Sequence, residues 1–375
     1  MSRLSTFISG LTIPSALLVA LIFASVATAD DKTDKKPDAK TAAVAKKEAA
    51  AKDAKKKPDA KNKKPAAKKP ATKKPAAKKP ADKKPADKKP ADKKAADKKP
   101  AAKADMKKKP AEKKKPAPKP AVSAFPDKAL EAAVRREVFA KRYNKEPITK
   151  EDVADISRVV GVGKKIKSLE GLQHCRALML IDLENNEIAD LKPIAELKRL
   201  QSVTLAGNKI ADLKPIENLT AMQLLDLSRN QVNDLSALSK MSNLRTLYVA
   251  NNQLKTIKPL EKLSKIWSLD VSNNKLKDLA PVGKLAWLTT LDIVGNQVES
   301  LKPIGGLRDL DMLIMSKNRV SDLKPLIEMC QKDAKGERRF APYLDVYLGG
   351  NPIEAKALDQ HTQTLKSFGV DVYNK

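Results

Sequence analysis

The chain has 375 residues, a formal net charge of +30, two cysteines and two histidines, and only 3% of its residues are aromatic. So few cysteines and histidines exclude a disulfide-rich scaffold and leave little material for a histidine-based metal or catalytic site. The charge is uneven. Residues 30–122 contain 35 Lys against 13 Asp and Glu, or +22, whereas residues 123–375 carry only +7.

Residues 1–29 have the pattern of an export signal. Arg3 precedes an apolar stretch from Leu11 to Val26, and Ala27-Thr28-Ala29 forms a small-residue cleavage site. The apolar stretch approaches the length of a membrane span, so an uncleaved anchor is the alternative. Cleavage is favoured because the Asp and Lys residues directly after the stretch balance each other. Either way we expect an exported protein that is periplasmic, cell-surface or secreted, and anchored if the signal stays uncleaved.

Residues 30–122 form a low-complexity tract in which a Lys-Lys-Pro-Ala-x unit recurs from Lys63 onward. The tract has no aromatic residue and cannot bury enough apolar area to offset chain entropy, so we expect disorder with an extended polyproline II bias. It is either a spacer at the cell envelope or a binder of polyanions, such as envelope polymers or anionic lipid. Export argues against chromosomal nucleic acid as the polyanion.

Globular sequence begins near Phe125. Leu130, Val134 and Val138 recur at helical spacing, which predicts a helix that begins at Pro126 or Asp127. After Pro147, Thr149 and Asp152 have the spacing of a capping box and predict a second short helix. We interpret residues 123–155 as an N-terminal helical cap, because a stacked repeat core must be covered at its open end.

The rest of the chain is an internal repeat of 22 residues marked by asparagine. Aliphatic residues three, five and eight positions before each Asn predict a short strand with one face inward. The Asn side chain is then expected to turn inward and satisfy backbone groups, which gives a structural Asn ladder rather than a set of ligands. Its members are Asn186, Asn208, Asn230, Asn252, Asn274, Asn296, Asn318 and Asn351.

Four residues after each Asn comes a residue that favours helix N-caps, as in Asp190, and it usually precedes Lys and Pro. Each unit therefore predicts a strand, an Asn turn and one capped turn of 3-10 or α-helix. A degenerate first unit has Lys164 in the Asn position, so the repeat domain spans 156–375. Before Asn351 an 11-residue insertion predicts a longer helix over 327–332 and an exposed basic loop. A helix with Leu358 and Leu365 and a strand at 370–372 are expected to close the C-terminal end.

The pattern N-x-I-x-D-L-x-P-I/L on this period resembles the bacterial internalin-type leucine-rich repeat over roughly residues 125–375. The resemblance implies an α/β fold, a right-handed solenoid with a parallel concave sheet and short 3-10 or α turns on the convex face. It also implies that the concave sheet binds a protein or peptide partner, as it often does in this family.

One outward position, four residues before each Asn, carries four carboxylates and two tyrosines. A row of like charges strengthens the local electrostatic potential, and aromatic residues often anchor protein interfaces. We therefore expect a basic or mixed partner here. The alternatives are that the carboxylates are merely solvated, or that they hold the chain's own Lys-rich tract. A column of Lys on the convex face solvates that face or extends a polyanion surface. The candidate ligand-binding residues are Asp182, Asp226, Arg229, Tyr248, Trp267, Asp270, Asp292 and Tyr347, and the convex lysines are Lys192, Lys214, Lys258, Lys302 and Lys324.

No arrangement in the sequence predicts catalysis, a metal or a cofactor. His174 and His361 lie at opposite ends of the array, as do Cys175 and Cys330, which are too far apart for a disulfide. No zinc-protease, nucleophile-elbow or phosphate-loop motif is present. We therefore expect an exported, non-catalytic protein that binds a protein or peptide on its concave face. The alternative is an envelope protein that binds a polyanion through the Lys-rich tract.

Overall fold

The computed structural model describes residues 122–374. The predicted export signal and almost all of the predicted Lys-rich tract lie outside these residues. Within the described part of the chain, no helix is both long and apolar enough to span a bilayer.

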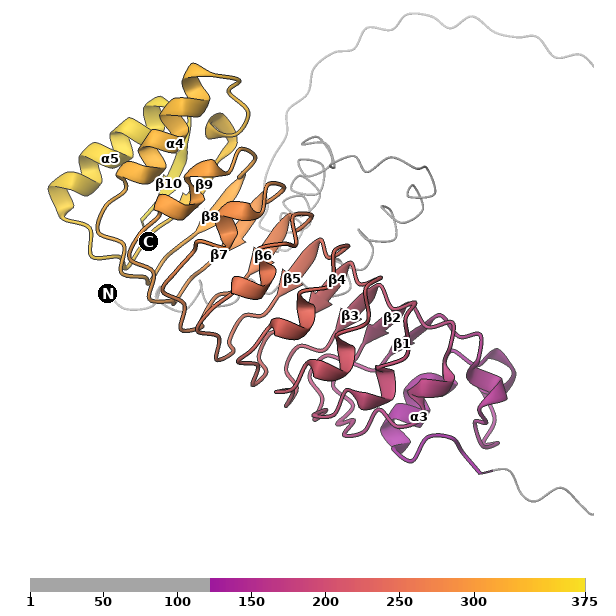
Figure 1. Cartoon of the computed structure of the whole chain (residues 1–375). Helices are drawn as coiled ribbons and strands as arrows, with labels where there is room; N and C mark the ends of the chain where they lie inside the picture. Colours follow the sequence, from indigo (N-terminus) through magenta and orange to yellow (C-terminus); the bar gives the residue numbers. More distant parts are fainter. Residues whose placement is uncertain (1–121, 375) are drawn as a thin grey trace, which may run out of the picture. The chain divides into compact units, whose positions relative to one another are not determined.

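Ten short strands form one parallel sheet in which the order in space follows the order in the chain (Figure 1). Each strand pairs in register with the next, so equivalent repeat positions become direct neighbours, as Asp226 and Tyr248 do. This confirms the leucine-rich repeat solenoid. The strands are β1 (Arg158–Val160), β2 (Leu180–Asp182), β3 (Ser202–Thr204), β4 (Leu224–Asp226), β5 (Thr246–Tyr248), β6 (Ser268–Asp270), β7 (Thr290–Asp292), β8 (Met312–Ile314), β9 (Asp345–Tyr347) and β10 (Asp371–Tyr373).

The inward residues of successive coils form one continuous core. Leu225, Leu247 and Leu269, at the middle of three adjacent strands, are fully buried. Burying each such side chain contributes about 1.5–3 kcal/mol. Because a strand alternates its faces, the first and third residues of every strand project to the opposite side. We call this side the strand face.

The asparagines tie neighbouring coils together. Asn208 accepts through Oδ1 from the Ile188 amide of the preceding coil at 3.0 Å. Its Nδ2 donates to the Leu183 carbonyl of that coil at 3.0 Å and to the Leu205 carbonyl of its own coil at 2.9 Å. The same bonds recur at the other repeat asparagines, and in the first coil the amides of Lys164 and Ile166 donate to Asn186 Oδ1. Each side chain satisfies buried groups on two coils at once.

The chain returns on the far side of the solenoid through single 3-10 turns, which Figure 1 shows in front of the sheet. The N-cap prediction is off by one residue in most coils and by three before Val282–Lys284, where Pro281 and not Asp278 is the cap. Asp190 Oδ1 accepts from the Lys192 amide at 2.9 Å, but Leu191 lies between them at the cap position. The aspartate therefore makes an Asx turn that starts the 3-10 turn. The turns are η3 (Leu172–His174), η4 (Lys192–Ile194), η5 (Lys214–Ile216), η6 (Ser236–Leu238), η7 (Lys258–Leu260), η8 (Val282–Lys284) and η9 (Lys302–Gly306).

The N-terminal end of the core is covered by α3 (Lys128–Arg135), which Asp127 caps through the Ala129 and Leu130 amides. The second predicted helix is only a 3-10 turn, η2 (Glu151–Val153), and an unpredicted one, η1 (Phe139–Lys141), precedes it. Half of the predicted capping box is made, because the Thr149 amide donates to Asp152 Oδ2 at 2.6 Å.

The C-terminal end is covered by the inserted segment and two helices. The predicted helix over 327–332 is longer, as α4 (Lys324–Lys335), and an exposed loop of residues 336–339 follows it. After η10 (Ala341–Tyr343), the chain forms β9, α5 (Ala355–Ser367) and β10. Leu365 of α5 is fully buried against this end of the core.

Candidate functional site

Six of the eight candidate ligand-binding residues lie in one row across the strand face. The third residues of successive strands are direct neighbours in the ladder, so strand pairing alone brings them together. We call this the outer row, and it extends to Tyr373 of β10. In order it reads Val160, Asp182, Thr204, Asp226, Tyr248, Asp270, Asp292, Ile314, Tyr347 and Tyr373.

The carboxylates of the outer row are held by their own backbone. Asp226 accepts from the Ser228 amide, and Asp270 from the Ser272 amide, each at 2.9 Å. Asp270 and Asp292 are neighbours on β6 and β7. Burial, and next the charge of Asp270, raise the pKa of Asp292 to about 7. Burial also raises the pKa of Asp270. The middle of the row is therefore a carboxylate pair that gains from a bound cation or a proton.

Two aromatic side chains in the middle of the strand face are fixed by hydrogen bonds. The hydroxyl of Tyr248 lies 3.4 Å from Ser268 Oγ. Trp267 is not in the outer row, because it comes directly before β6, and its Nε1–H donates to Thr246 Oγ1 at 2.9 Å. Both rings are half-buried. Held in this way, they offer contact area without a large loss of side-chain freedom on binding.

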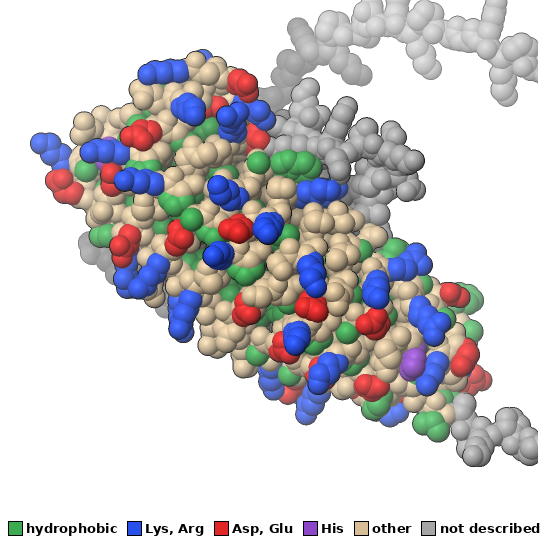
Figure 2. Space-filling model, viewed as in Figure 1, with side chains coloured by type: hydrophobic (Ala, Val, Ile, Leu, Met, Phe, Trp, Pro, Cys, Tyr) green, Lys and Arg blue, Asp and Glu red, His purple; other side chains and the backbone are tan. Residues whose placement is uncertain are grey.

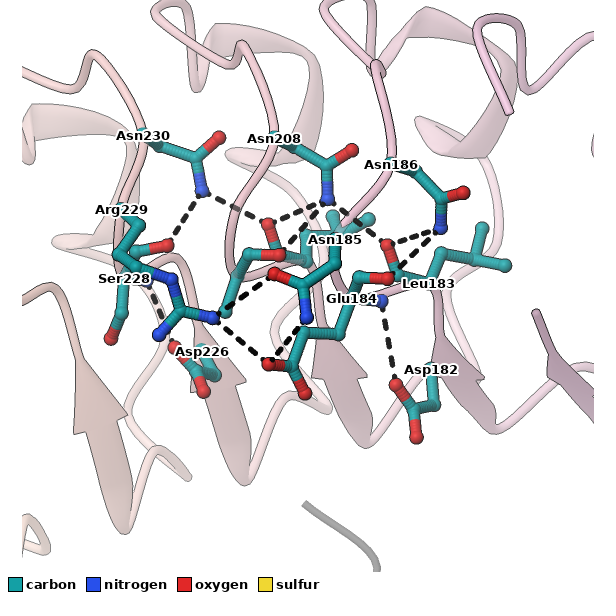
Figure 3. A network of polar contacts seen from close by, with 12 residues as sticks. Asp182, Leu183, Glu184, Asn185, Asn186, Asn208, Asp226, Ser228, Arg229 and Asn230 are labelled. Atoms are coloured by element: carbon teal, nitrogen blue, oxygen red, sulfur yellow. Dashed lines mark hydrogen bonds and ion pairs between the residues drawn. The ribbon is translucent and has the colours of Figure 1, made fainter. Parts of the chain in front are cut away.

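Arg229 lies outside the outer row, in the turn before Asn230. Its Nη2 donates to Glu184 Oε1 at 2.9 Å and to Asn185 Oδ1 at 3.3 Å, two coils away (Figure 3). Sequence reasoning found Arg229 but missed Glu184 and Asn185, because they are distant in the chain. One signal was available in the sequence: the position before each repeat Asn is mostly Asn or Gly, which tolerate a left-handed backbone. The structure shows that backbone at Asn185 (φ 57°) and at Arg229 (φ 56°).

The C-terminal end of the row is aromatic. The rings of Tyr347 and Tyr373 stack with centroids 4.5 Å apart and an interplanar angle of 11°. Tyr373 was not among the predicted site residues, because β10 lies outside the regular repeat. A stack of this kind offers an apolar platform beside the acidic centre of the row.

A second outward row was also missed. It consists of the first residue of each strand and runs parallel to the outer row, as strand alternation requires. We call it the inner row. It is largely uncharged and reads Arg158, Leu180, Ser202, Leu224, Thr246, Ser268, Thr290, Met312, Asp345 and Asp371.

The surface away from the strand face differs in character. Figure 2 shows the side of the 3-10 turns, where Lys and Arg alternate with Asp and Glu and do not gather into one patch. Two surface depressions of 420 and 230 Å³ lie beside the N-terminal cap and beside α4, and neither is lined by the outer row. Within residues 122–374 no group of three His, Cys, Asp or Glu residues is placed to hold a metal ion. Cys175 and Cys330 are buried free thiols whose pKa burial raises to about 12, so thiolate chemistry is suppressed.

Comparison with known proteins agrees with the fold. A family model described as Leucine Rich repeats (2 copies) matches residues 198–240, 220–265 and 242–284. The crystal structure of internalin C2 from Listeria monocytogenes is 30% identical, with a TM-score of 0.53, over 55% of this chain and 91% of that one. A second internalin of that species is 24% identical over 67% of this chain and 90% of its own, with a TM-score of 0.37. An Arabidopsis thaliana receptor kinase ectodomain, in complex with CASPARIAN STRIP INTEGRITY FACTOR 2, is 18% identical over 60% of this chain and 28% of its own, with a TM-score of 0.48. A search of curated proteins gives no match.

Proposed function

Because the chain belongs to the internalin-like leucine-rich repeat proteins, we propose that it is a non-catalytic protein that binds a protein or peptide ligand on its strand face. One observation carries this proposal. The outer row places carboxylates and aromatic rings next to one another on adjacent strands, in one line across the sheet. A partner with basic and apolar side chains complements such a line.

Three features of the strand face support a binding role over a catalytic one. The acidic pair Asp270 and Asp292 lies on an open sheet, and neither described depression includes it. An acid–base pair in a hydrolase needs a site that excludes water and positions a substrate. Hydrogen bonds hold the side chains of Tyr248 and Trp267 in place next to the pair. Aromatic side chains fixed in this way are suited to contact a partner.

The placement of the protein is the finer part of the proposal. Residues 1–29 direct export, residues 30–122 space the repeats from the envelope, residues 123–155 cap the core, and residues 156–375 recognise the partner. The sequence supports this division through the apolar stretch before Ala29 and the abrupt change in composition near Phe125.

The experiment is capture from an envelope extract by the full chain, its Tyr248→Ala variant and its Asp270→Asn variant. A discrete protein that the wild type retains through a high-salt wash, and that both variants lose, supports recognition by the strand face. Tyr343→Ala is the matched control, because Tyr343 is 68% exposed and lies outside both outward rows. Equal capture by all four proteins contradicts the proposal.

The second candidate function is binding of an envelope polyanion by the Lys-rich tract, and the +22 charge of residues 30–122 favours it. Binding through dense lysine releases counterions and weakens steeply with salt. Polyphosphate beads test it directly. Retention at low salt, loss at high salt and no effect of Tyr248→Ala would make the tract the recognition element.

A further inference from the structure

One section of the strand face combines features that the rest of the face lacks. It spans three adjacent strands, where inner-row residues of β2, β3 and β4 lie beside outer-row residues of the same strands. We call it the β2–β4 patch. Its six residues are Leu180, Asp182, Ser202, Thr204, Leu224 and Asp226.

The inner-row half of the patch is a serine between two leucines. Leu180 and Leu224 pair with Ser202 from either side and are 5% and 1% exposed. Neither leucine belongs to the hydrophobic core under the sheet, which agrees with their outward positions. The pair therefore gives the patch apolar walls on both sides of Ser202.

The hydroxyl of Ser202 is the unusual group. It is buried, with the residue 4% exposed, and its Oγ has no hydrogen-bond partner. Two other hydroxyls of the inner row have partners: Thr246 Oγ1 accepts from Trp267, and Ser268 Oγ lies within hydrogen-bond distance of the Tyr248 hydroxyl. A buried hydroxyl without a partner is costly, so such a group in a native protein requires an explanation. A ligand that forms a hydrogen bond with Ser202 Oγ would explain this group.

The outer-row half of the patch is negatively charged. Asp182 and Asp226 flank Thr204, and neither forms an ion pair with another described residue. Burial, with a contribution from the charge of Glu184, raises the pKa of both. The nearest guanidinium, that of Arg229, is engaged with Glu184 instead (Figure 3). Neither carboxylate therefore has a direct ion pair among the described residues, although the charge of Arg229 partly offsets the rise in the pKa of Asp226.

We propose that the β2–β4 patch binds an arginine side chain of the partner, with its guanidinium between Asp182 and Asp226 and its methylene stem between Leu180 and Leu224. The guanidinium also donates to Ser202 Oγ. This inference rests on the proposed function, since it names the side chain by which a strand-face ligand is anchored.

Arginine fits this geometry better than lysine. Strands two apart are separated by about 9.6 Å, because neighbouring strands are ~4.8 Å apart. A planar fork with five N–H donors can reach acceptors on both sides and the hydroxyl beside them. An ammonium carries its three donors on one nitrogen and cannot bridge the two carboxylates. Arginine is also more weakly hydrated, so its transfer into a patch with apolar walls costs less.

The test uses the full chain and an array of immobilised synthetic peptides. Each peptide has a fixed central Arg, Lys or citrulline, and its flanking positions vary over uncharged residues, so that the Lys-rich tract has no acidic target. At pH 8 we expect the Arg peptides to bind at least about tenfold more tightly than matched citrulline peptides. Asp226→Asn should abolish that preference. Asp278→Asn removes the same charge from an exposed position on the 3-10 side, outside both rows, and should preserve it.

Ser202→Ala separates a ligand role from a structural one. Deleting a buried hydroxyl that lacks a partner should raise the melting temperature of the free protein, by about 2–4 °C. The same change should weaken binding of the Arg peptides several-fold, because their guanidinium loses Ser202 Oγ as a hydrogen-bond acceptor. A structural role for the hydroxyl predicts the opposite sign in the melting experiment.

The outcomes distinguish this inference from the function on which it rests. Peptides that bind and depend on Tyr248, but show no preference for Arg over citrulline, overturn the arginine site and leave strand-face binding intact. An Arg preference that survives Asp226→Asn places the cation elsewhere and also overturns it. If no peptide or extract protein depends on any strand-face residue, the proposed function itself fails.

Discussion

In four coils an outward aspartate lies four residues before the inward asparagine, and the two side chains act in opposite ways. Asn230 is buried and bonds to backbone groups of two coils, so its polarity is fully used. Asp292 projects to the strand face beside another carboxylate. Burial and the charge of Asp270 both disfavour its ionised form. One side chain stabilises the fold, and the other lowers its stability in exchange for a charge on the surface.

Asp292→Asn should stabilise the protein at high pH. The pKa of Asp292 is raised from 3.8 to about 7, so the folded state binds a proton more tightly than the unfolded state. The contribution of protonated Asp292 to the stability of the fold is fully present below the pKa of the unfolded state. It is lost as the pH rises toward 7. Because the group is partly solvated, we expect a gain of about 1–2 kcal/mol at pH 8 and almost none at pH 4. Thermal unfolding at both pH values measures it. Asp278→Asn, on the opposite side, is the control, and an equal gain there contradicts the prediction.

Asn230→Ala should destabilise the protein strongly. It leaves the Ile210 amide and the carbonyls of Leu205 and Leu227 without their partner, in a site closed to water. Each unsatisfied buried group costs about 1–3 kcal/mol, so we expect a loss of at least about 3 kcal/mol. Urea unfolding measures it. Asn218→Ala removes an exposed asparagine on the 3-10 side and should cost under about 0.5 kcal/mol. Comparable losses would argue against the ladder bonds.

At the scale of elements, the repeat predicted structure best where local chemistry repeats. The strand positions and the single turns follow from spacing, and the structure confirms them. The errors occur where tertiary contacts set the length. The helix expected over 327–332 extends to Lys324–Lys335, and the second cap helix shrinks to one 3-10 turn. In both places the segment packs against an end of the core, where no neighbouring repeat defines its length.

One side chain, that of Asp333, accepts hydrogen bonds from several backbone amides of the inserted loop. Asp333 accepts through Oδ1 from the Arg339 amide at 2.9 Å and through Oδ2 from the Ala341 amide at 3.0 Å. Asp333→Ala should therefore release the loop while the strands remain folded, and trypsin should cut at Arg338 or Arg339 at least several-fold faster. Glu337→Ala, which removes an exposed ion pair with Arg339 within the same loop, is the control. Unchanged cleavage in the Asp333 variant would show that other contacts order the loop.

At the scale of the whole molecule, the solenoid is a one-dimensional stack whose ends need covers. Its core is continuous from Phe125, under the N-terminal cap, to Val370, beside α5. Each coil contacts mainly the coils on either side of it, so an uncovered end exposes apolar area without affecting the far end directly. The same linearity lets the strand face present acidic, aromatic and apolar sections in sequence along one surface.

Weakening the N-terminal cap should loosen the array from that end. Leu130 is fully buried in α3, and Leu130→Ala should cost about 2–5 kcal/mol. We expect hydrogen exchange to quicken first in β1 and β2, while β6 and β7 keep their protection. Leu269→Ala in the middle of β6 is the comparison. Uniform acceleration along the array after Leu130→Ala would show that the solenoid opens as one unit.

The sequence by itself determined the repeat, the parallel strands, the inward asparagines and the outward row of carboxylates and tyrosines. These follow from periodicity, because each coil repeats the same local geometry and pairing in register aligns equivalent positions. Only the tertiary structure decided which side chains meet across coils. The bridge from Arg229 to Glu184, the stack of Tyr347 on Tyr373 and the unpartnered hydroxyl of Ser202 are of this kind. They depend on distances and burial between residues far apart in the chain, which spacing within one repeat does not specify.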